Sequence, residues 1–126
     1  MRKRGVILWL AVLVILFPGA GFTGPDETLT REITYLLNTI ETTECAFLRN
    51  DVSYSSKEAA DHIRKKYDYF RDKIGSAEDF IELCASQSSM SGKPYMIKCG
   101  DSDAVPSRTW LKIKLDEFRR DNKFSY

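Results

Sequence analysis

Apolar residues recur at helical spacing between residues 55 and 74, in the stretch SSKEAADHIRKKYDYFRDKI. Intervals of three and four residues place side chains on one face of a helix. The apolar side chains with this spacing are Ala59, Ile63, Tyr67, Phe70 and Ile74. Ser55 and Glu58 have the spacing of a capping box, and Gly75 follows where a left-handed residue often ends a helix. The pattern therefore predicts a helix over residues 55–74.

Two further helices are predicted on either side of this segment. An apolar stripe runs through residues 29–40, with Thr28 as its N-cap, and its period ends near residues 42 and 43. Ser76 is the N-cap of the second helix, which has two acidic residues in its first turn, where the helix dipole favours negative charge. The apolar face of this shorter helix contains Cys84.

The last long segment fits two patterns. Leu111, Ile113 and Leu115 alternate like a strand, whereas Leu111, Leu115 and Phe118 have helical spacing. The length of the segment and a capping residue at Ser107 favour a helix over residues 107–120.

Three short segments are predicted to be strands. Residues 45–49 and 52–54 flank Asn50 and Asp51, which tolerate left-handed backbone, so this stretch is predicted to be a tight hairpin. Because a lone hairpin is only marginally stable, we expect residues 95–99 to add a third strand and residues 100–106 to form a loop. The order of elements predicts an α+β fold of about four helices packed on a small antiparallel sheet of about three strands.

The N-terminus has the layout of a secretory signal peptide. Arg2, Lys3 and Arg4 precede an apolar run at residues 6–17, and small or helix-breaking residues follow at 18–21. We therefore expect residues 1–21 to be a signal peptide and residues 22–126 to be a single α+β domain that is periplasmic or secreted. An uncleaved membrane anchor is the alternative, and contact with a membrane is expected only in that case.

Charge and cysteine content narrow the class of protein further. Removing Arg2, Lys3 and Arg4 from the 19 basic residues leaves 16 against 18 acidic ones, so the exported domain has no basic footprint for nucleic acid. Three cysteines in an exported chain predict one disulfide and one free thiol. We favour Cys45 with Cys99, since each borders a predicted strand, but the other pairings and three unpaired, buried cysteines stay open.

Five segments occur in an order that resembles a known family. They are FLRND, EAADHIRKKY, AEDFIE, SSMSGKPY and the pair Trp110–Leu111. Together they resemble small exported bacterial proteins of unknown function, the YfeK-like family. The resemblance implies an exported α+β domain and no particular activity. The family's hairpin usually reads Arg-Asn-Gly, whereas Asp51 stands here in place of the glycine.

The serine-rich loop is the most suggestive place for chemistry. Ser89 or Ser91 could be a nucleophile if His62, the single histidine, lay beside it as a base. The chain lacks the Gly-x-Ser-x-Gly elbow and the Ser-x-x-Lys spacing that such enzymes use. The plainer alternative is that these hydroxyls satisfy backbone groups of a tight loop. One histidine gives no reason to expect a metal, and no cofactor is predicted.

The other charged side chains of the central helix have structural explanations. His62 is one turn from Glu58 and could pair with it. Lys66, with its charged neighbours, resembles a solvated helix face rather than a binding stripe. Arg49 stands apart, because it ends an apolar strand before a tight turn. It could capture an anion or carboxylate, or it could pair with one of three acids, Glu41, Glu44 or Glu58.

Chain geometry predicts one polar patch. If residues 95–99 run antiparallel to residues 45–49, the serine-rich loop lies over the hairpin turn. The predicted binding patch consists of Arg49, Asn50, His62, Ser88, Ser89, Ser91, Lys93 and Tyr95. We therefore expect a non-enzymatic periplasmic module that binds a protein or another envelope component. The alternative is a small serine hydrolase or transferase that uses Ser89 or Ser91 with His62.

Overall fold

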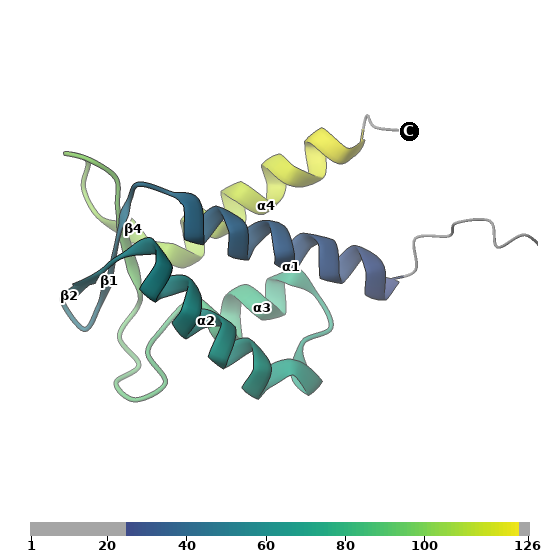
Figure 1. Ribbon diagram of the computed structural model, residues 1–126, viewed down its shortest axis with the longest axis horizontal. Helices are drawn as coiled ribbons and strands as arrows, with labels where there is room; N and C mark the ends of the chain where they lie inside the picture. The colour runs from purple at the N-terminus through teal and green to yellow at the C-terminus, as the bar shows by residue number, and fades with distance from the viewer. Residues whose placement is uncertain (1–24, 124–126) are drawn as a thin grey trace, which may run out of the picture.

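The computed structural model describes residues 25–123, so the predicted signal peptide lies outside the described residues. Four helices extend from one end of a small sheet (Figure 1). The helices are α1 (Pro25–Thr42), α2 (Ser56–Phe70), α3 (Ala77–Cys84) and α4 (Ser107–Lys123), and a short 3-10 helix, η1 (Arg71–Lys73), follows α2. The strands are β1 (Ala46–Arg49), β2 (Val52–Tyr54), β3 (Met96–Lys98) and β4 (Val105–Pro106).

The sheet has the strand order β2-β1-β3-β4, and every neighbouring pair is antiparallel. Phe47 on β1 lies opposite Tyr54 on β2 and Ile97 on β3, so these three side chains share the face that meets the helices. The predicted α+β class is confirmed. The predicted count of about three strands differs by one, because β4 forms within the expected loop and is a two-residue edge strand too short to show a pattern.

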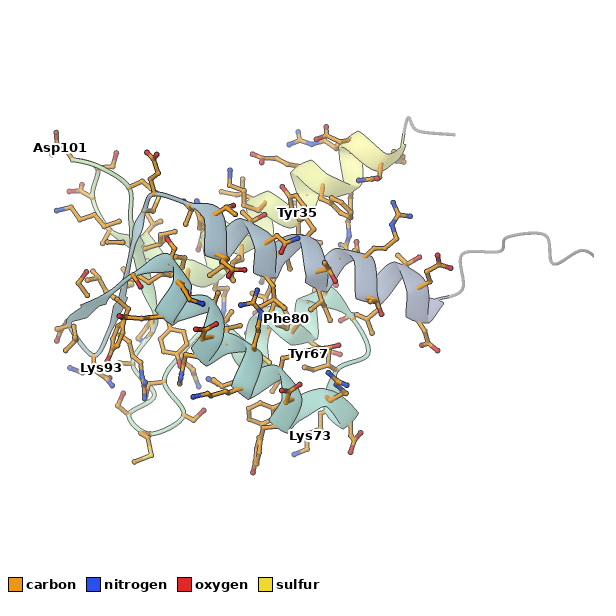
Figure 2. All side chains as sticks on the ribbon, in the orientation of Figure 1. Tyr35, Tyr67, Lys73, Phe80, Lys93 and Asp101 are labelled. Carbon is orange, nitrogen blue, oxygen red and sulfur yellow. A yellow bond between two sulfur atoms is a disulfide. The ribbon has the colours of Figure 1, made fainter. Side chains whose placement is uncertain are left out.

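The core lies where the helices converge on the sheet. Leu36, Phe80, Ile97 and Leu111 are fully buried and come from α1, α3, β3 and α4. Aromatic pairs extend the core outward, with Tyr67 edge-on to Phe80 at 5.6 Å between ring centroids (Figure 2). This core fixes the relative positions of α2, the hairpin and α4, which enclose the candidate site.

The starts of α2 and α3 follow local signals in the sequence. The Ser55 hydroxyl accepts a hydrogen bond from the Glu58 N–H at 3.2 Å, and the Ser76 hydroxyl accepts one from the Asp79 N–H at 3.1 Å, so these two predicted N-caps are confirmed. The N-cap predicted at Thr28 is wrong, because α1 begins at Pro25 and Thr28 lies within its first turn. The predicted left-handed end at Gly75 is wrong. The glycines with positive φ are Gly92 and Gly100, whereas α2 ends through η1 and the Gly75 N–H donates to the Asp79 carboxylate at 3.0 Å.

The favoured disulfide is present between Cys45 and Cys99, with 4.3 Å between the Cα atoms. It joins the residue before β1 to the residue after β3, at the end of this strand pair away from Arg49. Cys84 is unpaired and fully buried on α3, and burial raises the pKa of its thiol to about 11. That thiol is therefore protonated and unreactive at neutral pH.

The β1–β2 hairpin closes through a type I′ turn, because Asn50 and Asp51 both have positive φ, at 50° and 65°. This turn leaves Arg49 at the last position of β1. None of the helices in the described region is long and apolar enough to cross a membrane.

Candidate functional site

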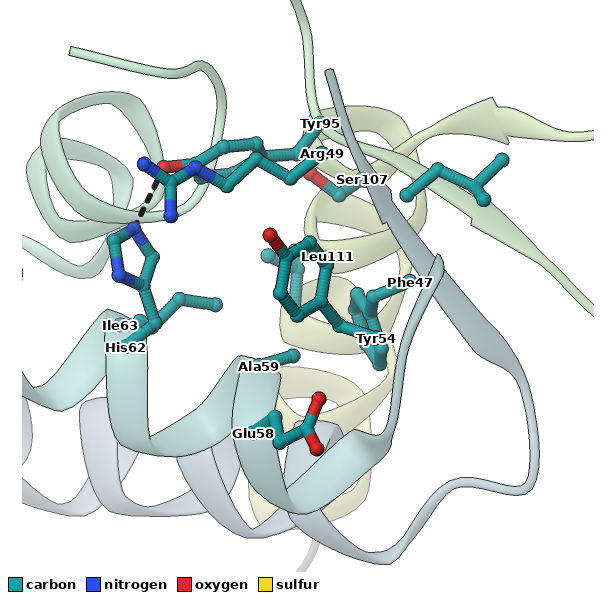
Figure 3. Close-up of a pocket in the computed structure, with 11 residues that line it drawn as sticks. Phe47, Arg49, Tyr54, Glu58, Ala59, His62, Ile63, Tyr95, Ser107 and Leu111 are labelled. Atoms are coloured by element: carbon teal, nitrogen blue, oxygen red, sulfur yellow. Dashed lines mark hydrogen bonds between the residues drawn. The ribbon is translucent and has the colours of Figure 1, made fainter. Parts of the chain in front are cut away.

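A cavity of about 200 Å³ lies between the hairpin, α2 and the start of α4 (Figure 3). Its walls are mainly apolar, because Ala59 and Ile63 on α2 face Phe47 and Tyr54 from the hairpin, with Leu111 of α4 beneath. The helical spacing that buries α2 against the sheet thus also supplies one wall of the cavity.

Three polar side chains meet at one end of this cavity, namely Arg49, His62 and Tyr95 (Figure 3). His62 Nε2 lies 3.0 Å from the Tyr95 hydroxyl oxygen. Behind them, the Lys66 ammonium donates to the same hydroxyl at 3.3 Å and to the carbonyl of Gln87 at 2.8 Å. A buried lysine therefore connects the polar end of the cavity to the loop that precedes β3.

The environment favours the neutral form of the imidazole. Burial lowers the pKa of His62, and the positive charges of Arg49, Lys66 and Lys65 lower it further. Burial also raises the pKa of the Tyr95 hydroxyl, so it keeps its proton. The hydroxyl oxygen can then accept from the Lys66 ammonium while its proton is donated to Nε2 of the neutral His62, which satisfies all three groups.

Lys66 carries a second charge into this region. Its side chain is buried, and burial lowers the pKa of its ammonium, with the charge of Arg49 acting in the same direction. Its ammonium also lies over the Tyr95 ring at 5.1 Å from the centroid. The polar end of the cavity thus combines two cationic side chains with a neutral imidazole and a phenol.

Arg49 has no carboxylate partner among the residues that the structure describes. Its Nε is buried and makes no hydrogen bond there. Of the acids predicted as partners, Glu41 binds Arg64 instead at 2.6 Å, and neither Glu44 nor Glu58 reaches Arg49. A buried N–H without an acceptor is costly, so this atom marks a place where an acceptor would be stabilising.

The predicted position of the serine-rich loop is confirmed. The Ser91 hydroxyl donates to the Asn50 side-chain oxygen at 2.6 Å, and Lys93 lies 3.4 Å from Asp51 beside the hairpin turn (Figure 2). The antiparallel pairing of β1 and β3 produces this approach. The exposed side chains of the loop and the hairpin turn contact one another. That this part of the predicted patch binds a ligand stays a prediction.

The serine hydroxyls serve the loop itself, as the plainer alternative expects. Ser88 is buried and its hydroxyl accepts from the Ser91 N–H at 3.4 Å, while Ser91 accepts from the Lys93 N–H at 3.3 Å. Ser89 is exposed. In the described part of the chain, His62 meets Tyr95 rather than a serine, so the nucleophile–base contact that a serine hydrolase needs is not formed.

Two parts of the site depart from the sequence prediction. Lys66 was expected on a solvated face but is buried, because it lies three residues after Ile63 and four before Phe70 on the apolar stripe. This spacing on the apolar stripe is the sequence signal that could have predicted the burial of Lys66. His62 was expected to pair with Glu58 but contacts Tyr95, a residue 33 positions away, for which the sequence offers no local signal.

The residues do not point to a metal centre, since residues 25–123 contain no group of three or more histidine, cysteine or acidic side chains that could hold an ion. The fold and the cavity instead define a small, disulfide-linked α+β domain with an apolar pocket and a cationic end.

The chain belongs to the family described as "Family of unknown function (DUF5329)", whose model matches residues 27–119. It is 35% identical over 94 residues to "Uncharacterized protein YfeK" of Salmonella typhimurium strain LT2. The aligned region covers 74% of this chain and 76% of that relative. The resemblance inferred from the five segments is thereby confirmed. No solved structure matches the chain.

Proposed function

We propose that the protein is an exported, non-enzymatic binding module of the bacterial envelope, with the cavity between the hairpin and α2 as its binding site. The observation that carries this proposal is the buried Arg49 Nε, which has no partner in the described residues and lies at the polar end of an apolar cavity. Concave, mainly apolar pockets with a few converging polar groups are the usual form of a small-molecule site.

Export is supported by two independent features. The N-terminal sequence has the charged, apolar and small-residue regions of a signal peptide, and the Cys45–Cys99 disulfide requires an oxidising compartment to persist. Fractionation of cells producing the full chain tests this proposal, with the periplasmic fraction expected to contain a shortened, disulfide-linked form. A full-length, reduced protein in the cytoplasm would contradict it.

Binding rather than turnover is supported by the hydrogen bonding around the cavity. Ser88 and Ser91 are engaged with the loop backbone or with Asn50, Ser89 is exposed, and His62 contacts Tyr95 rather than a serine. The Arg49 guanidinium and the apolar walls remain available to a ligand, and the Glu58 carboxylate also lines the cavity. The guanidinium and the apolar walls can hold and orient a molecule, and neither is a nucleophile.

The binding proposal can be tested by NMR with a library of small neutral, anionic and cationic compounds. We expect hits to shift the backbone amide signals of Tyr54, Ala59 and His62. Ala59→Leu, which fills the cavity from α2, should abolish these shifts, whereas Ala104→Leu, in the loop outside the cavity lining, should preserve them. Hits that shift only the serine-rich loop, or no hits at all, would contradict the cavity as the binding site.

A further inference from the structure

We infer that the cavity accepts a compact monocarboxylate, a molecule with one carboxylate group on an apolar body about the size of a single ring. This inference rests on the proposed function, because it names the ligand class of the same cavity.

The carboxylate is indicated by the contrast between Arg49 and other arginines of the chain. Four arginines on the surface each have a carboxylate within ion-pair distance, namely Arg64, Arg71, Arg108 and Arg119. Arg49 has no such partner among the described residues, although its Nε is withdrawn from water. An Nε–H and a neighbouring terminal N–H form a planar fork that matches the two oxygens of a carboxylate.

The charges around the fork favour an anion. The buried Lys66 places a second positive charge next to Tyr95, and His62 lies near these cations without a carboxylate partner in the described residues. Glu58 is the one acidic side chain that lines the cavity, and it forms no ion pair with Arg49. It lies on the first turn of α2, on the far side of Tyr54 from the guanidinium in Figure 3.

The cavity lining favours a singly charged ligand. Lys66 does not line the cavity and donates to Gln87 and Tyr95, so a ligand meets one guanidinium, which can neutralise one carboxylate. A dianion such as phosphate would face that single fork inside largely apolar walls. Burying an unneutralised charge in such surroundings is unfavourable. The carboxylate end is therefore expected at Arg49, and the rest of the molecule against the apolar walls.

The volume limits the apolar body. A dry protein cavity of about 150 Å³ is known to hold benzene. The present cavity, at about 200 Å³, leaves room for one ring and a short acidic arm. Phe47, Tyr54 and Leu111 offer ring and aliphatic surfaces to such a body. Sugars lack the apolar surface that would fill this space.

Calorimetric titration of the exported, disulfide-linked protein tests the inference with phenylacetate, its neutral counterpart phenylacetamide, and inorganic phosphate. We expect phenylacetate to bind at least tenfold more tightly than phenylacetamide, and phosphate to bind more weakly than either. In Arg49→Gln this preference should disappear, so that phenylacetate and phenylacetamide bind with about equal affinity. In Arg71→Gln, which removes an exposed arginine paired with Asp68, the preference should remain.

Arg49→Lys protects the test against loss of folding in Arg49→Gln. It keeps the charge without the fork, so we expect an intermediate preference for the acid. Equal affinity for phenylacetate and phenylacetamide in the native protein would overturn the monocarboxylate while leaving the cavity as a binding site. Tighter binding of phosphate would overturn it in favour of a dianion. If neither phenylacetate nor phenylacetamide binds, the inference is wrong, and the library screen decides separately whether the cavity binds anything.

Discussion

Removal of the Cys45–Cys99 disulfide is the perturbation whose energetic cost follows most directly from the fold. The bond joins residues 54 positions apart and fastens β1 to β3, the two central strands of the sheet. The double variant Cys45→Ala/Cys99→Ala keeps the strand pairing possible but frees the unfolded chain. The loss of stability is therefore expected to arise chiefly from the entropy of that chain.

The size of the effect follows from the length of the closed loop. For a loop of this length, the chain-entropy model gives a loss of about 4 kcal/mol in the free energy of unfolding. In a domain of about 100 residues, each kcal/mol lowers the melting temperature by roughly 4–8 °C. The double variant is thus expected to melt roughly 20 °C below the native protein.

Urea unfolding followed by circular dichroism measures this loss, and Cys84→Ala is the matched control. Cys84 is buried but unpaired, so its replacement should not change the response to dithiothreitol. Dithiothreitol should lower the stability of the native protein to that of the double variant and leave the double variant unchanged. A loss below about 1 kcal/mol in the double variant would refute the entropic argument. An equal effect of reductant on both proteins would refute the role of this disulfide.

Three further predictions concern single side chains. In urea unfolding, Lys66→Met should lower the free energy of unfolding by about 1–3 kcal/mol, because the Gln87 carbonyl and the Tyr95 hydroxyl lose a charged donor. Lys65→Met, on the exposed face of α2, should change it by less than about 0.5 kcal/mol. Equal losses would contradict the buried role of Lys66. The pKa of His62 is lowered in the folded protein, where the groups facing it are Arg49 of β1, Lys65 and Lys66 of α2, and Tyr95 before β3. As the pH falls below about 6.5, the histidine of the unfolded chain therefore takes up a proton before that of the folded protein does. Native stability should therefore fall more between pH 7.5 and pH 5 than that of His62→Gln, and parallel thermal-melting profiles across this range would show that the pKa is not shifted. Asp51 has a φ of 65°, a backbone conformation that glycine adopts without strain and alanine does not. Both Asp51→Gly and Asp51→Ala lose the pairing with Lys93, so the glycine variant should be about 1 kcal/mol more stable than the alanine variant. Equal melting temperatures would contradict this account of the turn.

The elements that the sequence predicted well are those specified by neighbouring residues. The caps at Ser55 and Ser76 depend on residues within three positions, and the buried stripe of α2 depends on spacing along one helix. The disulfide could be predicted because both of its cysteines border predicted strands. The edge strand β4 was missed because its two residues gain their conformation from pairing with β3.

The candidate site was predicted only in outline, because it depends on contacts between distant segments. The approach of the serine-rich loop to the hairpin followed from antiparallel strand order. The cavity behind it did not, since no local pattern shows that Ala59 and Leu111 leave a space between them. The absence of a described partner for Arg49 was equally hidden, because it depends on Glu41 binding Arg64 instead.

The most direct test of the account is the Arg49 Nε–H signal in the NMR spectrum of the protein labelled with nitrogen-15. Addition of phenylacetate should move this signal downfield and slow its exchange with water, because a carboxylate oxygen becomes its acceptor. The Nε–H signal of Arg71, which is already paired with Asp68, should not change. A saturable calorimetric signal for phenylacetate with an unmoved Arg49 signal, or with shifts confined to Ser91 and Lys93, would contradict the cavity as the binding site.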